Sequence, residues 1–589
     1  MREGPVVIAQ NGPSPTGTEP ASTQFQGVLT HHNDNFRSGQ DLSETVLTPA
    51  NVNTTSFGQL FSLPVDGFVY AQPLYVPNVT LSNNTTHNLI VVATEHDSVY
   101  AFDADVPGPP LWQTSFLNPA LQISTVPNGD VGTSDIVPEI GITGTPVIDP
   151  ATNTLYVVAK IKEPGPTYYQ QLHALNLTAG IDVVTPVSIT ASFPGSSQPT
   201  DGNGNVVFNA LRENQRSALL LVDEPAVSRK VVFIAWASHG DNQPYHGWVL
   251  GYDAATLEQL YVYNDSPNGI EGGIWQTGGG PGADQNGNVF VSTGNGTFDA
   301  NTGGLDYGDS FLNLAPGAST FTVATSFTPL DQATLAANDT DLGSGGVLLL
   351  PDQTTGPTHL LVSAGKQGNI YLVNRDSMGG FSSTTDNVVQ EIDGTIGGLF
   401  SNPAYWQGNV YFGSAGKGVQ AFSLSNGLLS STPTMSTSHS FAWPGTTPSI
   451  SANGSQNGIL WTIDTSAYAS TNPGTLYAYD ATNLSNELYD TGQNFVRDSL
   501  GPPVKFTVPT IANGKVYVGT QTQLSVYGLL TPTATPTVVV TGQAIAAAGP
   551  PETNSEYNGQ TLTLPSSPAA SGNSCLAVIL HDGLDSVVA

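Results

Sequence analysis

Short apolar segments separated by polar turns recur along most of the chain. A strand that opens with a small residue or proline appears eight times between residues 73 and 509, about once every 62 residues. These segments lie at 72–77, 145–149, 217–222, 280–284, 345–350, 402–405, 447–450 and 508–511. Each is followed by a nearly continuous apolar strand, and most units add a third strand that ends at Asp or Asn, as at 99–103. Such apolar strands are typical of sheets that are buried on both faces.

The repeat predicts an all-β fold. Sheets of about four strands that recur eight times, without helical periodicity between them, indicate an eight-bladed β-propeller. The alternative is a series of separate β-sandwich domains. A unit of this length is short for a sandwich of roughly 100 residues, and no linker composition separates the copies. The propeller is therefore the favoured prediction.

Composition divides the chain into four parts. Residues 1–26 form a polar leader that we expect to be disordered, and residues 27–530 carry the repeats. The Thr/Pro-rich segment 531–537 resembles a stiff extended linker. Residues 538–589 alternate Val, Thr and Leu with Gly and Pro, which predicts a short C-terminal β-rich tail or an incomplete β module.

Charge and cysteine content narrow the function classes. The chain has 46 acidic and 14 basic residues and a formal net charge of −32, so nucleic acid is a poor partner. The single cysteine, Cys575, excludes internal disulfides and cysteine-based metal sites. No apolar run is long enough for a transmembrane helix, and the first 26 residues contain no signal peptide. Scarce lysine and a surface rich in Thr, Asn and Gly favour a secreted or cell-surface protein.

The units resemble a known repeat. Residues 99–104, Val-Tyr-Ala-Phe-Asp-Ala, followed by a loop and Trp112, are similar to the repeat of pyrroloquinoline quinone (PQQ) propellers. Residues 37–40, Arg-Ser-Gly-Gln, and 47–52, Leu-Thr-Pro-Ala-Asn-Val, resemble the segment before the first blade of quinoprotein alcohol dehydrogenases. The resemblance covers residues 27–530. It implies PQQ near the propeller axis and a bound Ca²⁺.

Five positions resemble the cofactor site of that family. Glu139, in Pro-Glu-Ile-Gly, and Asn295, in Thr-Gly-Asn-Gly, are similar to calcium ligands. Trp275 resembles the tryptophan beneath the quinone, Lys366 the basic residue on the quinone oxygens, and Asp341 the catalytic base. The residue types suit these roles, because a hard cation prefers oxygen ligands, a quinone stacks on an aromatic ring, and a carboxylate can accept a proton.

Several features leave alternatives open. The adjacent cysteine pair that covers the quinone in many members is missing, as is a haem-attachment motif, so electrons would leave through a separate acceptor. The base is either Asp341 or Asp339, and Lys417 lies in a setting similar to that of Lys366. Residues 95–97 either line the channel or form an ordinary turn. Residues 238–248 hold two histidines seven positions apart with an aspartate between them, which form either a metal site, an axial binding loop or an ordinary structural loop.

Two functions are consistent with these observations. The first is an extracellular quinoprotein-type oxidoreductase that acts on a small alcohol or a sugar with PQQ and Ca²⁺. The second is a non-catalytic propeller of the same ancestry that serves as a binding, scaffold or cell-surface assembly module with a protein or surface partner.

Overall fold

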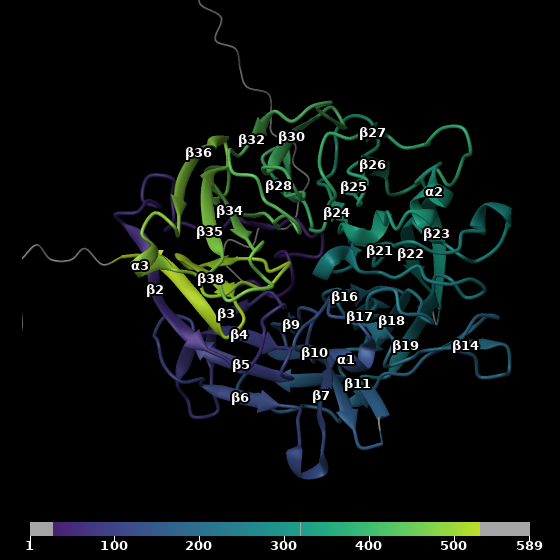
Figure 1. The fold of residues 1–589 in the computed structure, drawn as a ribbon, viewed down its shortest axis with the longest axis horizontal. Helices are drawn as coiled ribbons and strands as arrows, with labels where there is room; N and C mark the ends of the chain where they lie inside the picture. Colours follow the sequence, from purple (N-terminus) through teal and green to yellow (C-terminus); the bar gives the residue numbers. More distant parts are fainter. Residues whose placement is uncertain (1–26, 166, 318–319, 531–589) are drawn as a thin grey trace, which may run out of the picture. The chain divides into compact units, whose positions relative to one another are not determined.

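Eight antiparallel sheets follow one another around a ring in the computed structural model, which describes residues 27–530 except 166, 318 and 319. Figure 1 shows the sheets in chain order, with the last strands beside the first. This arrangement confirms the predicted eight-bladed β-propeller. The expected leader (1–26), linker (531–537) and C-terminal module (538–589) lie outside the described residues.

Each blade has a core of three or four antiparallel strands, counted outward from the axis. Blades 1 to 4 consist of β3 (Leu74–Thr80), β4 (Thr86–Thr94), β5 (Ser98–Asp103) and β6 (Trp112–Ser115); β9 (Val147–Asp149), β10 (Thr154–Glu163), β11 (Thr167–Asn176) and β12 (Val187–Ser188); β16 (Leu220–Glu224), β17 (Arg229–Ser238), β18 (Trp248–Asp253) and β19 (Gln259–Asn264); and β20 (Gly282–Ala283), β21 (Val289–Ser292), β22 (Phe311–Pro316) and β23 (Phe321–Phe327).

Blades 5 to 8 repeat the pattern with shorter strands. They consist of β24 (Leu348–Leu349), β25 (Leu360–Ala364), β26 (Ile370–Asn374) and β27 (Gln390–Ile392); β28 (Ala404–Trp406), β29 (Asn409–Phe412), β30 (Gln420–Ser425), β31 (Leu428–Leu429) and β32 (Met435–Ser436); β33 (Ser449–Asn453), β34 (Gln456–Asp464), β35 (Thr475–Asp480) and β36 (Asn483–Asp490); and β37 (Thr510–Ala512), β38 (Lys515–Gly519), β39 (Gln523–Leu529) and β2 (Phe57–Pro64). The inner strand of every blade overlaps one of the eight predicted segments, and five of these strands extend beyond the end of their segment.

The hydrophobic core lies between neighbouring blades. In blade 3, every residue of β17 from Val231 to Ser238 is buried. Phe233 packs with Val291 and Leu312 of blade 4 in one cluster, whereas Ile234 on the other side of the strand packs with Leu172 of blade 2. Side chains alternate between the two faces of a strand, and both faces meet a neighbouring sheet. This packing explains why the sequence shows continuous apolar runs.

The ring is closed by a strand from the other end of the chain. The outermost strand of blade 8 is β2, which precedes blade 1 and pairs antiparallel with β39 from Phe57 opposite Leu529 to Pro64 opposite Gln523. The sequence did not predict this pairing. It joins the two ends of the propeller through backbone hydrogen bonds, so blade 8 is complete only when both ends of residues 27–530 are folded.

The segment before β2 lies inside the ring. It hydrogen-bonds to the inner strands of six blades through the pairs Val28–Tyr75, Leu29–Ile148, Asn35–Ala283, Phe36–Leu349, Ser38–Tyr405 and Gly39–Ile450. Its short strand β1 (Gln40–Asp41) runs parallel to β33. The Arg37 side chain is fully buried and donates hydrogen bonds to the backbone oxygens of Pro281, His31 and Leu219.

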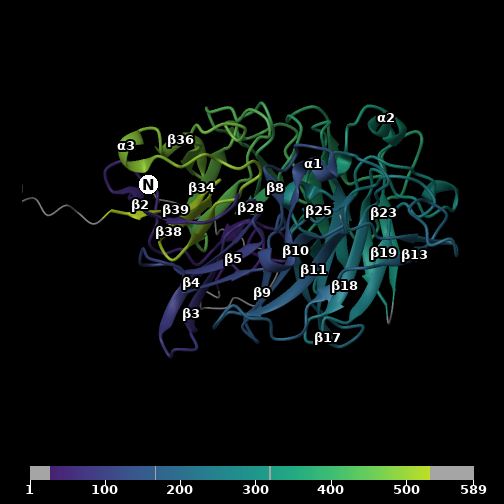
Figure 2. The same ribbon diagram turned by 60° about the horizontal axis from the view of Figure 1, so that its bottom comes forward.

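The remaining elements lie in the connections. They are β7 (Ser124–Pro127), β8 (Glu139–Ile140), β13 (Ser192–Pro194), β14 (Asn205–Val207), β15 (Glu213–Asn214), α1 (Asn128–Val131), α2 (Gln332–Ala337) and α3 (Phe495–Asp498). All three α-helices are in connections from the outer strand of one blade to the inner strand of the next, and Figure 2 shows them along one face of the ring. Within the described residues, no helix is long and apolar enough to cross a membrane.

Candidate functional site

The predicted site residues all come from connections at one end of the propeller. In an antiparallel four-stranded blade, the turn between the second and third strands and the link to the next blade lie at the same end. Glu139, Trp275 and Asp341 are in links between blades, whereas Asn295 and Lys366 are in turns between second and third strands. The fold therefore places all five at the face that carries the α-helices.

A cavity opens at this end, among connections from around the ring. It encloses about 610 Å³, including part of its open mouth. Three of the five predicted residues, Trp275, Asp341 and Lys366, line it. The other lining residues are Asp135, Arg216, Gly240, Asp241, Thr277, Ser344, Phe400, Trp443 and Phe506. Acidic, basic and aromatic side chains therefore line one cavity together.

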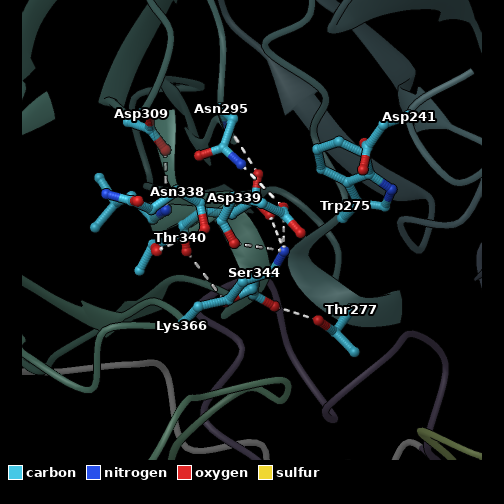
Figure 3. Close-up of polar contacts among 12 residues, drawn as sticks. Asp241, Trp275, Thr277, Asn295, Asp309, Asn338, Asp339, Thr340, Ser344 and Lys366 are labelled. Carbon is cyan, nitrogen blue, oxygen red and sulfur yellow. Dashed lines mark hydrogen bonds and ion pairs between the residues drawn. The ribbon is translucent and has the colours of Figure 1, made fainter. Parts of the chain in front are cut away.

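Lys366 is the centre of a charged cluster on one wall of the cavity (Figure 3). Its Nζ lies 2.6 Å from Oδ2 of Asp341 and 2.6 Å from Oδ1 of Asp339. The Asp341 side chain is only 8% exposed, whereas that of Asp339 is 69% exposed. Burial alone would lower the pKa of Lys366, but the carboxylates of Asp341 and Asp339 outweigh burial and raise it. Lys366 therefore stays an ammonium ion.

Asn295 joins the same cluster from the neighbouring blade. Its backbone N–H donates to Oδ1 of Asp341 at 2.7 Å, and its side-chain Nδ2 donates to Oδ1 of Asp339 at 3.1 Å. Its Oδ1 atom is buried and accepts no hydrogen bond from the described residues. The structure thus brings Asn295, Asp341 and Lys366 together, and the buried acid of the pair is Asp341.

Trp275 forms another wall of the cavity. Its indole N–H donates to the backbone oxygen of Ser238 at 3.2 Å, and its ring meets that of Tyr245 edge to face at 5.8 Å. A Cβ atom at Gly294 would lie 2.5 Å from Oδ1 of Asp341 and 2.6 Å from the Trp275 ring. Only glycine at position 294 leaves room for this close approach of ring and carboxylate.

Glu139 has other partners. Its Oε1 lies 2.8 Å from Nδ1 of His96, and its Oε2 accepts a hydrogen bond from Thr125 at 2.5 Å. It does not line the cavity, and within the described residues no hydrogen bond or ion pair joins it to Asn295. No three His, Cys, Asp or Glu side chains among those residues form a group that could hold a metal ion. The assignment of calcium to Glu139 and Asn295 stays a prediction.

A second charged cluster at the cavity was not predicted from the sequence. Arg216 Nη1 lies 3.0 Å from Oδ2 of Asp135, and Lys505 contacts the other oxygen of the same carboxylate. Burial would raise the pKa of Asp135, but Arg216 and Lys505 hold it below the usual value. Arg216 and Phe506 stack at 4.2 Å. No motif marks these residues, and Asp135 and Lys505 are 370 positions apart.

The loop at 238–248 contributes an acid to the cavity and holds its histidines elsewhere. Asp241 lines the cavity, and burial followed by the charge of Asp341 raises its pKa. His239 Nε2 lies 2.7 Å from Nζ of Lys160. His246 contacts the Ser266 hydroxyl and the Gln198 backbone oxygen. Both histidines are buried in the surrounding structure, in accord with the interpretation of this segment as a structured turn.

Glu95 gives a prediction about pH. It is fully buried and accepts a hydrogen bond from the Gly141 N–H at 2.7 Å; burial outweighs this contact and raises its pKa to about 8. The folded protein therefore binds a proton here that the unfolded chain releases above its lower pKa of about 4.3. The contribution of this proton to the free energy of unfolding is therefore greatest below pH about 4.3. Between that pH and pH 8 it falls by about 1.4 kcal/mol per pH unit.

We expect Glu95→Gln to flatten the decrease in unfolding free energy between pH 5 and pH 8. Urea unfolding at several pH values measures this slope. Glu258→Gln, at an exposed glutamate, is the control and should leave the slope unchanged. An unchanged slope in Glu95→Gln would show that Glu95 is ionised in the folded protein.

Comparison with known proteins supports the fold. No protein-family model and no curated protein matches the sequence. The structure is similar to that of a quinohemoprotein alcohol dehydrogenase from Comamonas testosteroni, with a TM-score of 0.55 and 14% sequence identity, over 85% of this chain and 80% of that one. A second similar structure is the quinohemoprotein alcohol dehydrogenase ADHIIG from Pseudomonas putida HK5, with a TM-score of 0.53 and 13% identity, over 90% and 82% of the two chains. The chain therefore shares its fold, an eight-bladed β-propeller, with these two quinohemoprotein alcohol dehydrogenases.

Proposed function

We propose that the cavity lined by Trp275, Asp341 and Lys366, called the axial cavity below, binds PQQ. We further propose that the protein is a secreted oxidoreductase acting on an alcohol or a sugar. The observation that carries this proposal is the ion pair between the nearly buried Asp341 and Lys366, which lines one open cavity together with Trp275. A carboxylate, an ammonium group and an aromatic ring are the groups that a quinone and a hydroxyl substrate require. The fold of the two similar structures is consistent with the proposal.

The residues present fit PQQ. The ring of Trp275 offers an aromatic surface for a planar quinone. The ammonium group of Lys366 can donate hydrogen bonds to quinone or carboxylate oxygens, and charge-assisted bonds of this kind are stronger than neutral ones. When bound, PQQ would accept the hydride equivalent that leaves the substrate carbon.

The residues around Asn295 do not fit a calcium ion in the same way. The Asn295 Oδ1 atom is a free oxygen, but Lys366 holds the two nearest carboxylates, those of Asp339 and Asp341. Glu139 is held by His96 and Thr125. A calcium ion requires six to eight oxygen ligands. The proposed reaction is therefore derived without calcium.

Asp341 has the position of a general base. It is almost buried and lines the cavity, and its two oxygens are held by the Asn295 N–H and by Lys366. These contacts fix the carboxylate where it can accept the proton of a substrate hydroxyl group. Because the site is partly shielded from water, an interaction between charges there is stronger than on the surface. Lys366 would balance the charge of the carboxylate until the proton is transferred.

A non-catalytic propeller is the second candidate. Glu139 already has protein partners, His96 and Thr125. Lys366 is paired with Asp339 and Asp341. Neither residue therefore needs a cofactor to complete its polar contacts, which favours this candidate. In that case the cavity or the outer surface would serve as a binding or assembly site for a protein or surface partner. Binding of PQQ separates the two candidates.

Calorimetric titration with PQQ tests the proposal. We expect saturable binding to the wild-type protein and a loss of at least tenfold in affinity in Lys366→Gln, because one charge-assisted hydrogen bond contributes about 1.5–3 kcal/mol. Lys417→Gln is the matched control: Lys417 is exposed and occupies the corresponding turn of the next blade, so its loss should leave the affinity unchanged.

The same titration examines calcium. Glu139→Ala, with and without added Ca²⁺, should bind PQQ as the wild type does. A calcium-dependent affinity that this substitution abolishes would restore the calcium assignment of Glu139. If the wild-type protein releases no heat with PQQ in either condition, the oxidoreductase proposal fails and the search turns to surface partners.

A further inference from the structure

Arg216 lies where two cavities meet. It lines the axial cavity and also a second, narrow cavity with room for about one water molecule, whose other lining residues include His31, Tyr70, Thr143 and Phe506. Its side chain is 7% exposed and stacks on the ring of Phe506. One guanidinium nitrogen, Nη1, bonds to Asp135, whereas Nη2 is buried and has no hydrogen-bond partner among the described residues. A buried charged N–H group without an acceptor is costly.

The charges around Arg216 are unbalanced. Asp135 is shared between two cations, Arg216 and Lys505. Lys505 has no second carboxylate: within the described residues its other contacts are the rings of Trp443, Tyr468 and Phe506. Burial raises the pKa of Glu95, which senses the charge of Arg216, to about 8, so Glu95 is protonated at neutral pH. Within the described residues, Asp135 is therefore the one carboxylate that forms ion pairs with these two cations.

The smaller cavity adds polar groups that suit an anion. His31 is 3% exposed, and its Nδ1 atom is buried without a partner among the described residues. Burial, followed by the charges of His32 and Arg37, lowers the pKa of His31 well below its usual value, so its ring is neutral and can donate one N–H. Tyr70 and Thr143 are further polar residues in the same lining, and the Thr143 side chain hydrogen-bonds to Glu95.

We propose that the junction of the two cavities is a binding site for a small anion, with Arg216 as its principal ligand and Lys505 and His31 beside it. A carboxylate group suits this site best, because guanidinium groups bind carboxylates through directed N–H donors. The inference does not depend on PQQ. It assigns to Arg216 Nη2 an acceptor that no described protein group supplies, and it explains why two cations share one carboxylate in a strongly acidic protein.

Calorimetric titration with sodium formate, sodium chloride and inorganic phosphate, each in the absence of PQQ, tests the site in the full chain. We expect saturable binding of formate, and the chloride and phosphate titrations show whether charge alone or carboxylate geometry determines the affinity. Arg216→Gln should weaken formate binding at least tenfold. Arg375→Gln is the matched control, because Arg375 is equally buried but does not line either cavity. Absence of saturable binding by all three anions would overturn the proposal.

Asp135→Asn gives a test that misfolding cannot imitate. Removing this carboxylate leaves Arg216 and Lys505 without their shared partner, so the affinity for formate should rise several-fold. Lower or unchanged affinity in a folded Asp135→Asn protein would contradict the site. Because these titrations contain no PQQ, their failure leaves the proposed oxidoreductase function standing, and the failure of PQQ binding leaves the anion site standing.

Discussion

Asp341→Asn should lower kcat for PQQ-supported oxidation of an alcohol or sugar by about 10²–10⁴-fold, the range that a general base contributes. Asparagine keeps the shape of the side chain, but its single amide oxygen can accept from either the Asn295 N–H or Lys366 and not from both, and it cannot accept the substrate proton. The affinity for PQQ should therefore remain within a few-fold of the wild-type value. Steady-state kinetics with added PQQ, together with calorimetry, measures both quantities.

Asp339→Asn is the control for this experiment. Both aspartates contact Lys366 at 2.6 Å, and the sequence could not decide which of them is the base. The structure distinguishes them, because Asp341 is nearly buried and lines the cavity, whereas Asp339 is 69% exposed. We expect Asp339→Asn to change kcat by less than about tenfold. An equal loss of kcat in both variants would show that Asp341 acts only as part of the ion-pair cluster.

The blades could be predicted because the pattern that marks each strand lies within the sequence of that strand. A strand buried on both faces leaves a continuous apolar run, and the eight inner strands were found from a recurring short segment that opens with a small residue or proline just before such a run. The closure of the ring was not predicted. The strand β2 is outermost in its blade, its exposure alternates, and its partner β39 lies more than 450 residues away. Nothing in the local sequence of β2 indicates which strand it will join.

Part of the candidate site could also be predicted, because some of its residues stand in recognisable local sequence motifs. Trp275, Asp341 and Lys366 each stand in a short motif, and the fold brings them to one cavity. Arg216 and Lys505 have no motif, and their relation to Asp135 appears only when distant blades meet. Glu139 illustrates the opposite case: its motif resembles a calcium ligand, yet its neighbours His96 and Thr125 provide contacts that the motif does not contain.

Phe57→Ala should lower the free energy of unfolding by about 3–5 kcal/mol, the usual cost of removing a buried phenylalanine side chain. Phe57 is fully buried in β2, and its ring packs against those of Tyr489 at 5.0 Å and Trp461 at 5.5 Å, both in blade 7. The substitution removes packing exactly where the closing strand meets the neighbouring blade. Urea unfolding followed by tryptophan fluorescence measures the change for the propeller, because all seven tryptophans lie between residues 112 and 461.

Leu60→Ala separates ring closure from a general effect on β2. Leu60 is in the same strand but is 36% exposed, so its truncation should cost less than about 1.5 kcal/mol. If the closing strand holds the ring together, Phe57→Ala should shift a single transition to lower urea concentration, since a blade that loses its outer strand exposes the faces of both neighbours. A separate early transition would instead mean that blade 8 opens alone, and that seven blades are stable without closure.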